Sequence, residues 1–157
     1  MKTLIPAASV TSPSASPDYI RALEADVLAR TLWGEARGEG VPGMQAVAAV
    51  ILNRVAIARK KGRFWWGNTI LQVCQKPYQF SCWNKADPNF KQITAVDEGD
   101  LHFATALRIA RRAVIGKIDD QTQGSTHYHS VDILPFWAKN AKACARIGHH
   151  LFYKLEG

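Results

Sequence analysis

The segment from Leu28 to Gly40 places a glutamate on the apolar side of a helix that is about to end. Leu28, Leu32 and Glu35 are spaced four and three residues apart, so they lie on one helix face. A carboxylate on that face is partly removed from water, and desolvation raises its pKa. A glutamate that stays protonated near neutral pH can donate a proton to a leaving group. Glu35 is therefore a candidate general acid.

The same spacing also fits a structural role for Glu35. In that interpretation the carboxylate at the helix end pairs with Arg30 or Arg37. Structural ion pairs perturb pKa values as well, so the spacing alone does not decide between the two roles.

The length of 157 residues and the hydrophobic content of 47% predict one folded domain with a sizeable core. Residues 1–16, rich in Ser, Pro and Ala, are expected to form a flexible leader, and residues 17–157 a single catalytic domain. The apolar patch at residues 4–8 is too short for a clear signal peptide, and no apolar run is expected to span a membrane. We expect a monomer that does not insert into membranes.

The chain carries a net charge of +7, which suits a polyanionic partner such as nucleic acid, an anionic membrane or the acidic bacterial wall. Six basic residues and no acidic one fall between Arg54 and Lys76. The three cysteines, an odd number, argue against a disulfide framework and favour free, buried thiols.

Helical signals occupy the first three quarters of the chain. A helix should begin at residues 16–18, with a capping serine and a proline, and run to about residue 37. A second, centrally buried helix is predicted at 44–60, a short helix capped by Asn68 runs to residue 75, and a third long helix covers 101–115. Residues 87–89 read as a turn.

The final third has strand signals instead. Residues 125–130 predict a strand whose alternate residues His127 and His129 share a face. Residues 143–147 and 151–154 predict a hairpin around Gly148. The expected class is α+β: a mostly helical domain with a small antiparallel sheet in the C-terminal third.

Several motifs in order resemble the catalytic domain of the cell-wall hydrolase family typified by bacterial spore cortex-lytic enzymes. The resemblance covers roughly residues 20–155, and its motifs lie at residues 34–39, 45–55, 78–81, 110–116 and 147–153. It implies a lysozyme-like fold that cleaves peptidoglycan between N-acetylmuramic acid and N-acetylglucosamine, with Glu35 in the position of the family's catalytic glutamate. It also implies that the region of Gln79 and Phe80 lines the cleft.

Glycosidic cleavage needs an acid and a group that stabilises or traps the oxocarbenium-like centre. Glu39 is a possible second carboxylate, with Asp132 and Glu98 more distant candidates. A single glutamate would suit a lytic transglycosylase, and two carboxylates a muramidase. The substrate-binding candidates are Asn53, Arg54, Gln79, Phe80, His127, Tyr128, His129, Trp137 and His150.

Two of these candidates, Asn53 and Arg54, could equally serve to satisfy nearby backbone carbonyls. The resembled family carries aromatic residues where His127 and Tyr128 stand, and the Asn-Pro that tends to follow them is missing here. The cleft wall formed by this strand is therefore expected to differ from that of the family.

Two other functions remain open. One is a zinc-dependent N-acetylmuramoyl-L-alanine amidase in which His127 and His129 hold the metal with His149 or His150. The chain lacks a His-Glu-x-x-His motif that would strengthen this alternative. The other is a basic module that binds the wall or nucleic acid without catalysis, although no familiar nucleic-acid-binding motif is present.

The favoured prediction is a peptidoglycan-degrading enzyme that needs no metal or cofactor and does not act on nucleic acid. The resemblance, the small size and the absence of a clear export signal suggest a phage endolysin. Such an enzyme would accumulate in the host cytoplasm and reach the periplasm and wall through a holin.

Overall fold

A computed structural model describes residues 16–155 and confirms the predicted α+β class. The predicted leader lies outside the described residues, apart from Ser16. The elements in chain order are α2 (Pro17–Ala36), η1 (Arg37–Glu39), α3 (Gly40–Lys60), α4 (Ile70–Gln75), η2 (Ser81–Trp83), α5 (Pro88–Ala95), α6 (Leu101–Val114), β1 (His127–Ser130), η3 (Phe136–Ala138), β2 (Ala145–Ile147) and β3 (His150–Tyr153).

The helix α2 begins as predicted and is tied to α6 at its other end. The Ser16 hydroxyl accepts a hydrogen bond from the backbone N–H of Tyr19, which satisfies one of the free donors of the first turn. Near the C-terminal end of α2, the Trp33 indole N–H donates to Asp100 Oδ1 across 3.1 Å. The same oxygen caps α6 by accepting from the N–H of Phe103. One carboxylate therefore fixes the start of α6 against the end of α2.

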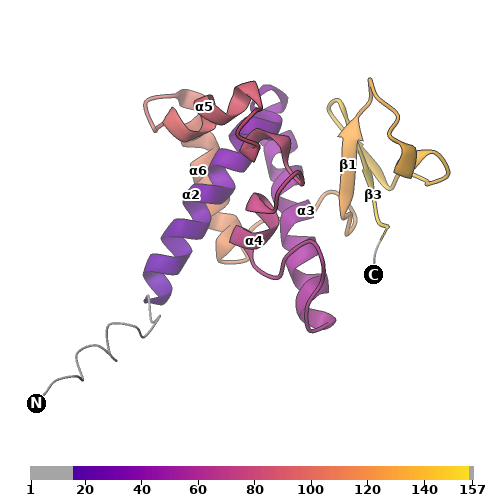
Figure 1. The fold of residues 1–157 in the computed structure, drawn as a ribbon, viewed down its shortest axis with the longest axis horizontal. Coiled ribbons are helices and arrows are strands. Elements are labelled where there is room, and N and C mark those ends of the chain that lie inside the picture. Colours follow the sequence, from indigo (N-terminus) through magenta and orange to yellow (C-terminus); the bar gives the residue numbers. More distant parts are fainter. Residues whose placement is uncertain (1–15, 156–157) are drawn as a thin grey trace, which may run out of the picture.

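The helix α3 is the centre of the fold. It packs against α2 and α6 on one side, and Figure 1 shows the sheet next to it on the other. Met44, Val47 and Ile51 are buried in the main core, whereas Ala46 and Val50 are buried against Phe152 of the sheet. A helix with apolar residues on both sides has two partners to cover them, as the sequence predicted.

The sheet has three antiparallel strands in the order β1-β3-β2. In the register of β1 and β3, Tyr128 lies opposite Phe152 and His127 opposite Tyr153. Tyr128 packs against both hydrophobic clusters, the one between the helices and the one between α3 and the sheet. This strand residue therefore sits where the sheet meets the helical body.

Three local predictions were wrong. The second helix begins at Gly40 rather than at residue 44, because Gly40 adopts φ +73 directly after η1 and turns the chain there. Residues 87–89 do not form an isolated turn, because Asp87 caps α5 and accepts from the N–H of Asn89. Thr69, not Asn68, caps α4, and the Asn68 side chain accepts from the N–H of Phe64 instead.

One apolar window is long enough to span a membrane, although no such run was expected. Within Pro17–Lys60 a window of 18 residues reaches a mean hydropathy of 1.5, enough for a membrane span by composition. That window is 61% buried inside the protein, so its apolar residues form the core shared by α2 and α3. Cys74 and Cys82 are buried free thiols, as predicted, whereas the free thiol of Cys144 is partly exposed and not buried as expected.

Candidate active site

Glu35 lies in the last turn of α2, and the residue before it determines what packs there. A side chain at Gly34 would place its Cβ 2.8 Å from Cβ and 2.9 Å from Sγ of Cys82. Only glycine allows this approach without a shift of the neighbouring segment. Gly34 thus lets η2, which carries Cys82, close over the end of α2 beside Glu35.

Tyr128 of β1 closes the site from the other side. Its hydroxyl donates a hydrogen bond to Oε1 of Glu35 across 2.5 Å. Because Oε1 accepts this hydrogen, Oε2 is the oxygen that can carry the proton of the acid form. The sheet therefore presents a hydrogen-bond donor to one oxygen of Glu35.

The surroundings of Glu35 raise the pKa of its carboxyl. Desolvation by burial is the largest cause, and the negative charge of Asp87 acts in the same direction. Hydrogen bonds from Tyr128 and from the thiol and backbone of Cys82 favour the carboxylate and oppose the shift, but they do not cancel it. Burial and Glu35 also hold the pKa of the Tyr128 hydroxyl well above its usual value, so Tyr128 remains a donor at any physiological pH.

The ion-pair interpretation of Glu35 was wrong. Arg30 forms its ion pair with Asp26 across 3.0 Å and donates to the carbonyls of Ile93 and Val96. Arg37 donates to the Trp33 carbonyl and lies 4.0 Å from the centre of the Trp33 ring. Within residues 16–155 Glu35 thus forms no ion pair, and its burial is not offset by a cation.

Glu39 connects the helices to the hairpin of β2 and β3. Its Oε1 accepts from the backbone N–H of His149 across 2.8 Å, and its Oε2 lies 3.2 Å from Nδ1 of the same histidine. The backbone hydrogen bond is the largest cause that lowers the pKa of Glu39. A Cβ added at Gly43 or at Gly148 would collide with the Glu39 side chain, so two glycines make room for it. Both oxygens are engaged in anchoring the hairpin, which is not the arrangement of a second catalytic carboxylate.

Asn53 and Arg54 of α3 both bind the segment that leads into β1. The Asn53 amide donates to Asp120 Oδ2 across 3.0 Å and to the Ser125 carbonyl across 2.9 Å. Arg54 donates through Nε to the carbonyl of Thr126 across 2.8 Å. The prediction that they satisfy nearby backbone carbonyls is confirmed, and for Asn53 these contacts use both amide hydrogens.

A pocket of about 400 Å³ lies at Arg54, and its lining does not include Glu35. Its lining residues are Arg54, Trp65, Lys76, Pro77, Tyr78, Gln79, His127 and Trp137. Four of the predicted substrate-binding residues line it together: Arg54, Gln79, His127 and Trp137. The Gln79 amide is also a structural donor, since it binds the carbonyls of Trp66 and Val73. Phe80 is buried next to this pocket rather than exposed in it.

The histidines of β1 lie in an aromatic cluster. The His127 ring is 5.2 Å and the His129 ring 5.6 Å from the ring of Trp137. Burial and the charge of Arg54 lower the pKa of His127 to about 4, so His127 is neutral at physiological pH. His150 lies 5.0 Å from the Tyr128 ring, and burial lowers its pKa as well.

The three-ligand zinc site predicted for the amidase alternative does not form in the part of the chain that the structure describes. No group of three or more His, Cys, Asp and Glu side chains within residues 16–155 is placed to hold a metal ion. His129 directs Nδ1 to the Ser130 carbonyl and Nε2 to the Tyr153 hydroxyl, at 2.7 and 2.8 Å. Both of its ring nitrogens are therefore already in use.

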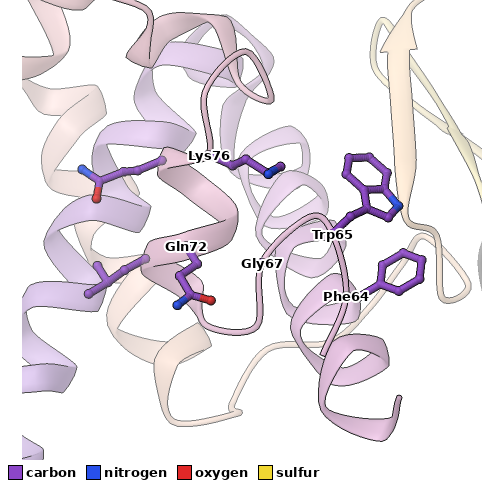
Figure 2. A pocket seen from close by; sticks show the side chains of 7 residues that line it. Phe64, Trp65, Gly67, Gln72 and Lys76 are labelled. Atoms are coloured by element: carbon purple, nitrogen blue, oxygen red, sulfur yellow. The ribbon is translucent and has the colours of Figure 1, made fainter. Parts of the chain in front are cut away.

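A second pocket, of about 500 Å³, lies on the other side of Trp65 and Lys76. It is lined by Phe64, Trp65, Gly67, Leu71, Gln72, Gln75 and Lys76. Figure 2 shows Lys76 extending from the end of α4 toward the side of Trp65. Because Trp65 and Lys76 line both pockets, this hollow continues the one beside Arg54 and does not include Glu35.

Sequence reasoning missed Cys82 and Asp87 as neighbours of Glu35. The thiol of Cys82 shares a hydrogen bond with Glu35, which together with burial raises the pKa of that thiol far above its usual value. The sequence predicts only a turn at Asp87. The one available signal was Gly34, because a glycine inside a helix often marks the close approach of another segment.

The mainly helical body with its small sheet agrees with what the comparisons with known proteins found. The pattern of a family described as Cell Wall Hydrolase matches residues 38–153. The chain belongs to this cell wall hydrolase family.

Its relatives with curated names are spore cortex-lytic enzymes. The chain is 32% identical to the spore cortex-lytic enzyme of Bacillus cereus over 131 residues. This alignment covers 82% of this chain and 43% of the relative. The chain is also 32% identical over 129 residues to the enzyme of Halalkalibacterium halodurans, covering 80% and 33%. The chain thus spans less than half the length of these relatives.

Two solved structures share the fold. The catalytic domain of the Bacillus cereus SleB protein has a TM-score of 0.62 at 29% identity, covering 83% of this chain and 89% of that one. The catalytic domain of a germination-specific lytic transglycosylase, SleB from Bacillus anthracis, has a TM-score of 0.64 at 29% identity, covering 92% and 100%. The predicted fold and family are confirmed.

Proposed function

We propose that this chain cleaves the glycan strand of peptidoglycan as a lytic transglycosylase, with Glu35 as the acid and then the base. The observation that carries the proposal is the environment of Glu35: a buried carboxyl with a raised pKa, one oxygen held by Tyr128 and no cation paired with it among the described residues. That is the state a proton donor needs at neutral pH.

In the first step Glu35 gives its proton to the glycosidic oxygen between N-acetylmuramic acid and N-acetylglucosamine. The bond from that oxygen to the anomeric carbon breaks, and positive charge develops on the muramic ring. In the second step the 6-hydroxyl of the same muramic residue bonds to the anomeric carbon. Its proton passes to the Glu35 carboxylate, which restores the acid and leaves a 1,6-anhydro end.

The transglycosylase reaction is favoured over a muramidase because it requires one carboxylate. Glu39, the predicted second carboxylate, is engaged with His149. The solved relative from Bacillus anthracis is itself called a lytic transglycosylase, which supports the same choice. In a muramidase a water molecule would take the place of the 6-hydroxyl, and a reducing end would result.

Mass spectrometry of purified sacculi digested by the protein tests the proposal. Anhydro-muramic ends are the expected product. Reducing muramic ends would replace the transglycosylase by a muramidase with the same acid. Release of free peptides with intact glycan strands would overturn the assignment of Glu35 and restore the amidase alternative.

The narrower role of a phage endolysin stays a prediction from the sequence. Expression in a bacterial host with and without a holin tests it. An endolysin lyses the cell only once the holin opens the membrane, whereas lysis without the holin would contradict this role.

A further inference from the structure

The pocket lined by Arg54, Lys76 and Trp65 is positively charged and aromatic. Two of its lining residues, Arg54 and Lys76, are cationic, and none of the described residues that line it is acidic. Trp65, Tyr78 and Trp137 are exposed at 58%, 86% and 39%, so their rings are free to meet a ligand. Basic and aromatic groups together suit a sugar or peptide that carries negative charge.

Arg54 lines this pocket and carries one donor without a partner among the described residues. Its side chain is only 8% exposed, its Nε is bonded to Thr126, and its Nη1 is buried without a hydrogen-bond partner among the described residues. The guanidinium lies 5.0 Å from the ring centre of Trp66 and 5.9 Å from that of Phe80. Burial lowers its pKa to about 10, so it is still charged at neutral pH. A buried charge without a counter-ion is costly, and an anion in the pocket would offset that cost.

Tyr78 is fixed at this pocket in an uncommon backbone conformation. It is a non-glycine residue with φ +65, and its backbone N–H donates to the side chain of Asn84 across 3.2 Å. Residues held in this region of φ cost energy and concentrate at ligand sites. An exposed aromatic ring held in this way is placed for contact with a ligand rather than for the core.

Two connections link the pocket to the proposed catalytic glutamate. The charge of Arg54 acts on the Tyr128 hydroxyl, which binds Glu35. The chain also runs from Gln79 in the pocket lining to Cys82, which lies beside Glu35.

We propose that Arg54 and Lys76 bind a carboxylate group of the glycan strand, while Trp65, Tyr78 and Trp137 contact the sugar or peptide that carries it. This inference rests on the proposed function, since it takes the glycan strand as the substrate. Two carboxylates have this chemistry. One is the lactyl carboxylate of a muramic residue without peptide, and the other belongs to the stem peptide.

The test measures Kd for glycan strands of equal length on the Glu35→Gln background, which prevents turnover. Four preparations are compared: strands without peptide and strands with stem peptides, each with free carboxylates or with the carboxylates converted to amides. We expect tighter binding of the free acid in one of the two pairs. A difference in the peptide-free pair identifies the lactyl carboxylate, and a difference confined to the peptide-bearing pair identifies the stem.

Lys76→Gln should then weaken binding of the preferred acid by about tenfold and leave binding of its amide unchanged, because a charge-assisted hydrogen bond is lost. The side-chain nitrogen of Lys76 forms no ion pair among the described residues, so Lys76→Gln should not disturb the fold. Lys91→Gln, on the exposed face of α5, removes the same charge elsewhere and is the control. Arg54→Lys is a second variant that keeps the charge but loses the fork of donors and the bond to Thr126, so its readout is the ratio of acid to amide affinity, which should fall.

Equal affinity for acid and amide in both pairs would overturn the inference, as would an equal loss in Lys76→Gln and Lys91→Gln. The proposed function is assessed separately, through cleavage of the amidated strands by the protein with Glu35 intact. Cleavage of amidated strands supports the glycosidic reaction whatever the outcome for the carboxylate.

Discussion

The Tyr128 hydroxyl donates to Oε1 of Glu35 across 2.5 Å, although the two residues lie 93 positions apart in the sequence. Glu35 lies in the last turn of α2, whereas Tyr128 belongs to β1 of the sheet. Neither helix nor sheet alone can therefore orient the proposed acid. Because of this hydrogen bond, the proposed chemistry of Glu35 in α2 depends on how the sheet is positioned on α3.

Tyr128→Phe tests this relationship because it keeps the ring and removes only the donor. The Tyr128 hydrogen bond lowers the pKa of Glu35, so its loss should raise that pKa further. The alkaline limb of the pH–activity profile, where the acid loses its proton, should move to higher pH. Activity at the new optimum should fall by about tenfold or less, the worth of one hydrogen bond. An unchanged profile would mean that Tyr128 only fills space.

The helices of this fold could be predicted from local signals. The capping serine at residue 16 and the apolar stripe of α3 gave element types and most boundaries. The start of α5 was missed because Asp87 and a following proline occur both in turns and at helix N-termini. Only the packing of Ile93 in the core separates the two cases.

The site could be predicted only in part. The position of Glu35 on an apolar face, and its resemblance to a known glutamate, indicated the acid. The partners of that acid could not be derived, because Cys82 and Asp87 reach it through the path of a loop and not through any periodic pattern. Glu39 seemed a catalytic partner because it is close in sequence, yet its contacts are with the hairpin turn at His149.

Glu39→Gln should affect stability more than chemistry. The variant keeps an acceptor for the His149 N–H but loses the charge that the histidine ring faces. The folded-state pKa of Glu39 is lowered, so its stabilising effect is present above the unfolded pKa and is lost as pH falls through the folded value. The Tm of the variant should therefore lie below that of the wild type at pH 7 and approach it as pH falls through the folded pKa of Glu39. An activity loss larger than that of Glu35→Gln would transfer the role of the acid to Glu39.

Chelation should leave the lytic activity intact. The proposed proton donor is a carboxyl group, and the ring nitrogens of His129 are already bonded to Ser130 and Tyr153. Turbidity loss on outer-membrane-stripped cells, measured with and without EDTA, checks whether lysis requires a metal ion. Loss of lysis in EDTA with recovery on adding zinc would contradict the glycosidase mechanism.

Glu35→Gln should abolish most of the activity without loss of fold. Glutamine keeps the size of the side chain but cannot cycle a proton, and general acid–base catalysis contributes on the order of 10²–10⁴ in rate. Binding to sacculi should stay near the wild-type level. Glu24→Gln is the matched control, because Glu24 lies on the same helix and burial raises its pKa too. A fully active Glu35→Gln variant would end the proposed mechanism.

Glu35→Gln should also be more stable than the wild type, and this difference in stability should depend on pH. The pKa of Glu35 is raised in the folded protein, so folding favours its protonated form. Its contribution to stability is fully present below the unfolded pKa of about 4.3 and is lost as pH rises through the folded value. At pH 7 the wild type therefore holds a desolvated charge or must take up a proton, and glutamine removes both costs.

Thermal unfolding of the two proteins between pH 4 and pH 8 checks this expectation. The Tm of Glu35→Gln minus that of the wild type should be near zero at pH 4 and should grow to a positive plateau above the folded pKa of Glu35. The pH at which that rise levels off reports the folded pKa and should coincide with the alkaline limb of the activity profile of the free enzyme. A difference that stays constant with pH would mean that Glu35 has the same pKa in the folded and unfolded states, which would contradict its role as a buried acid.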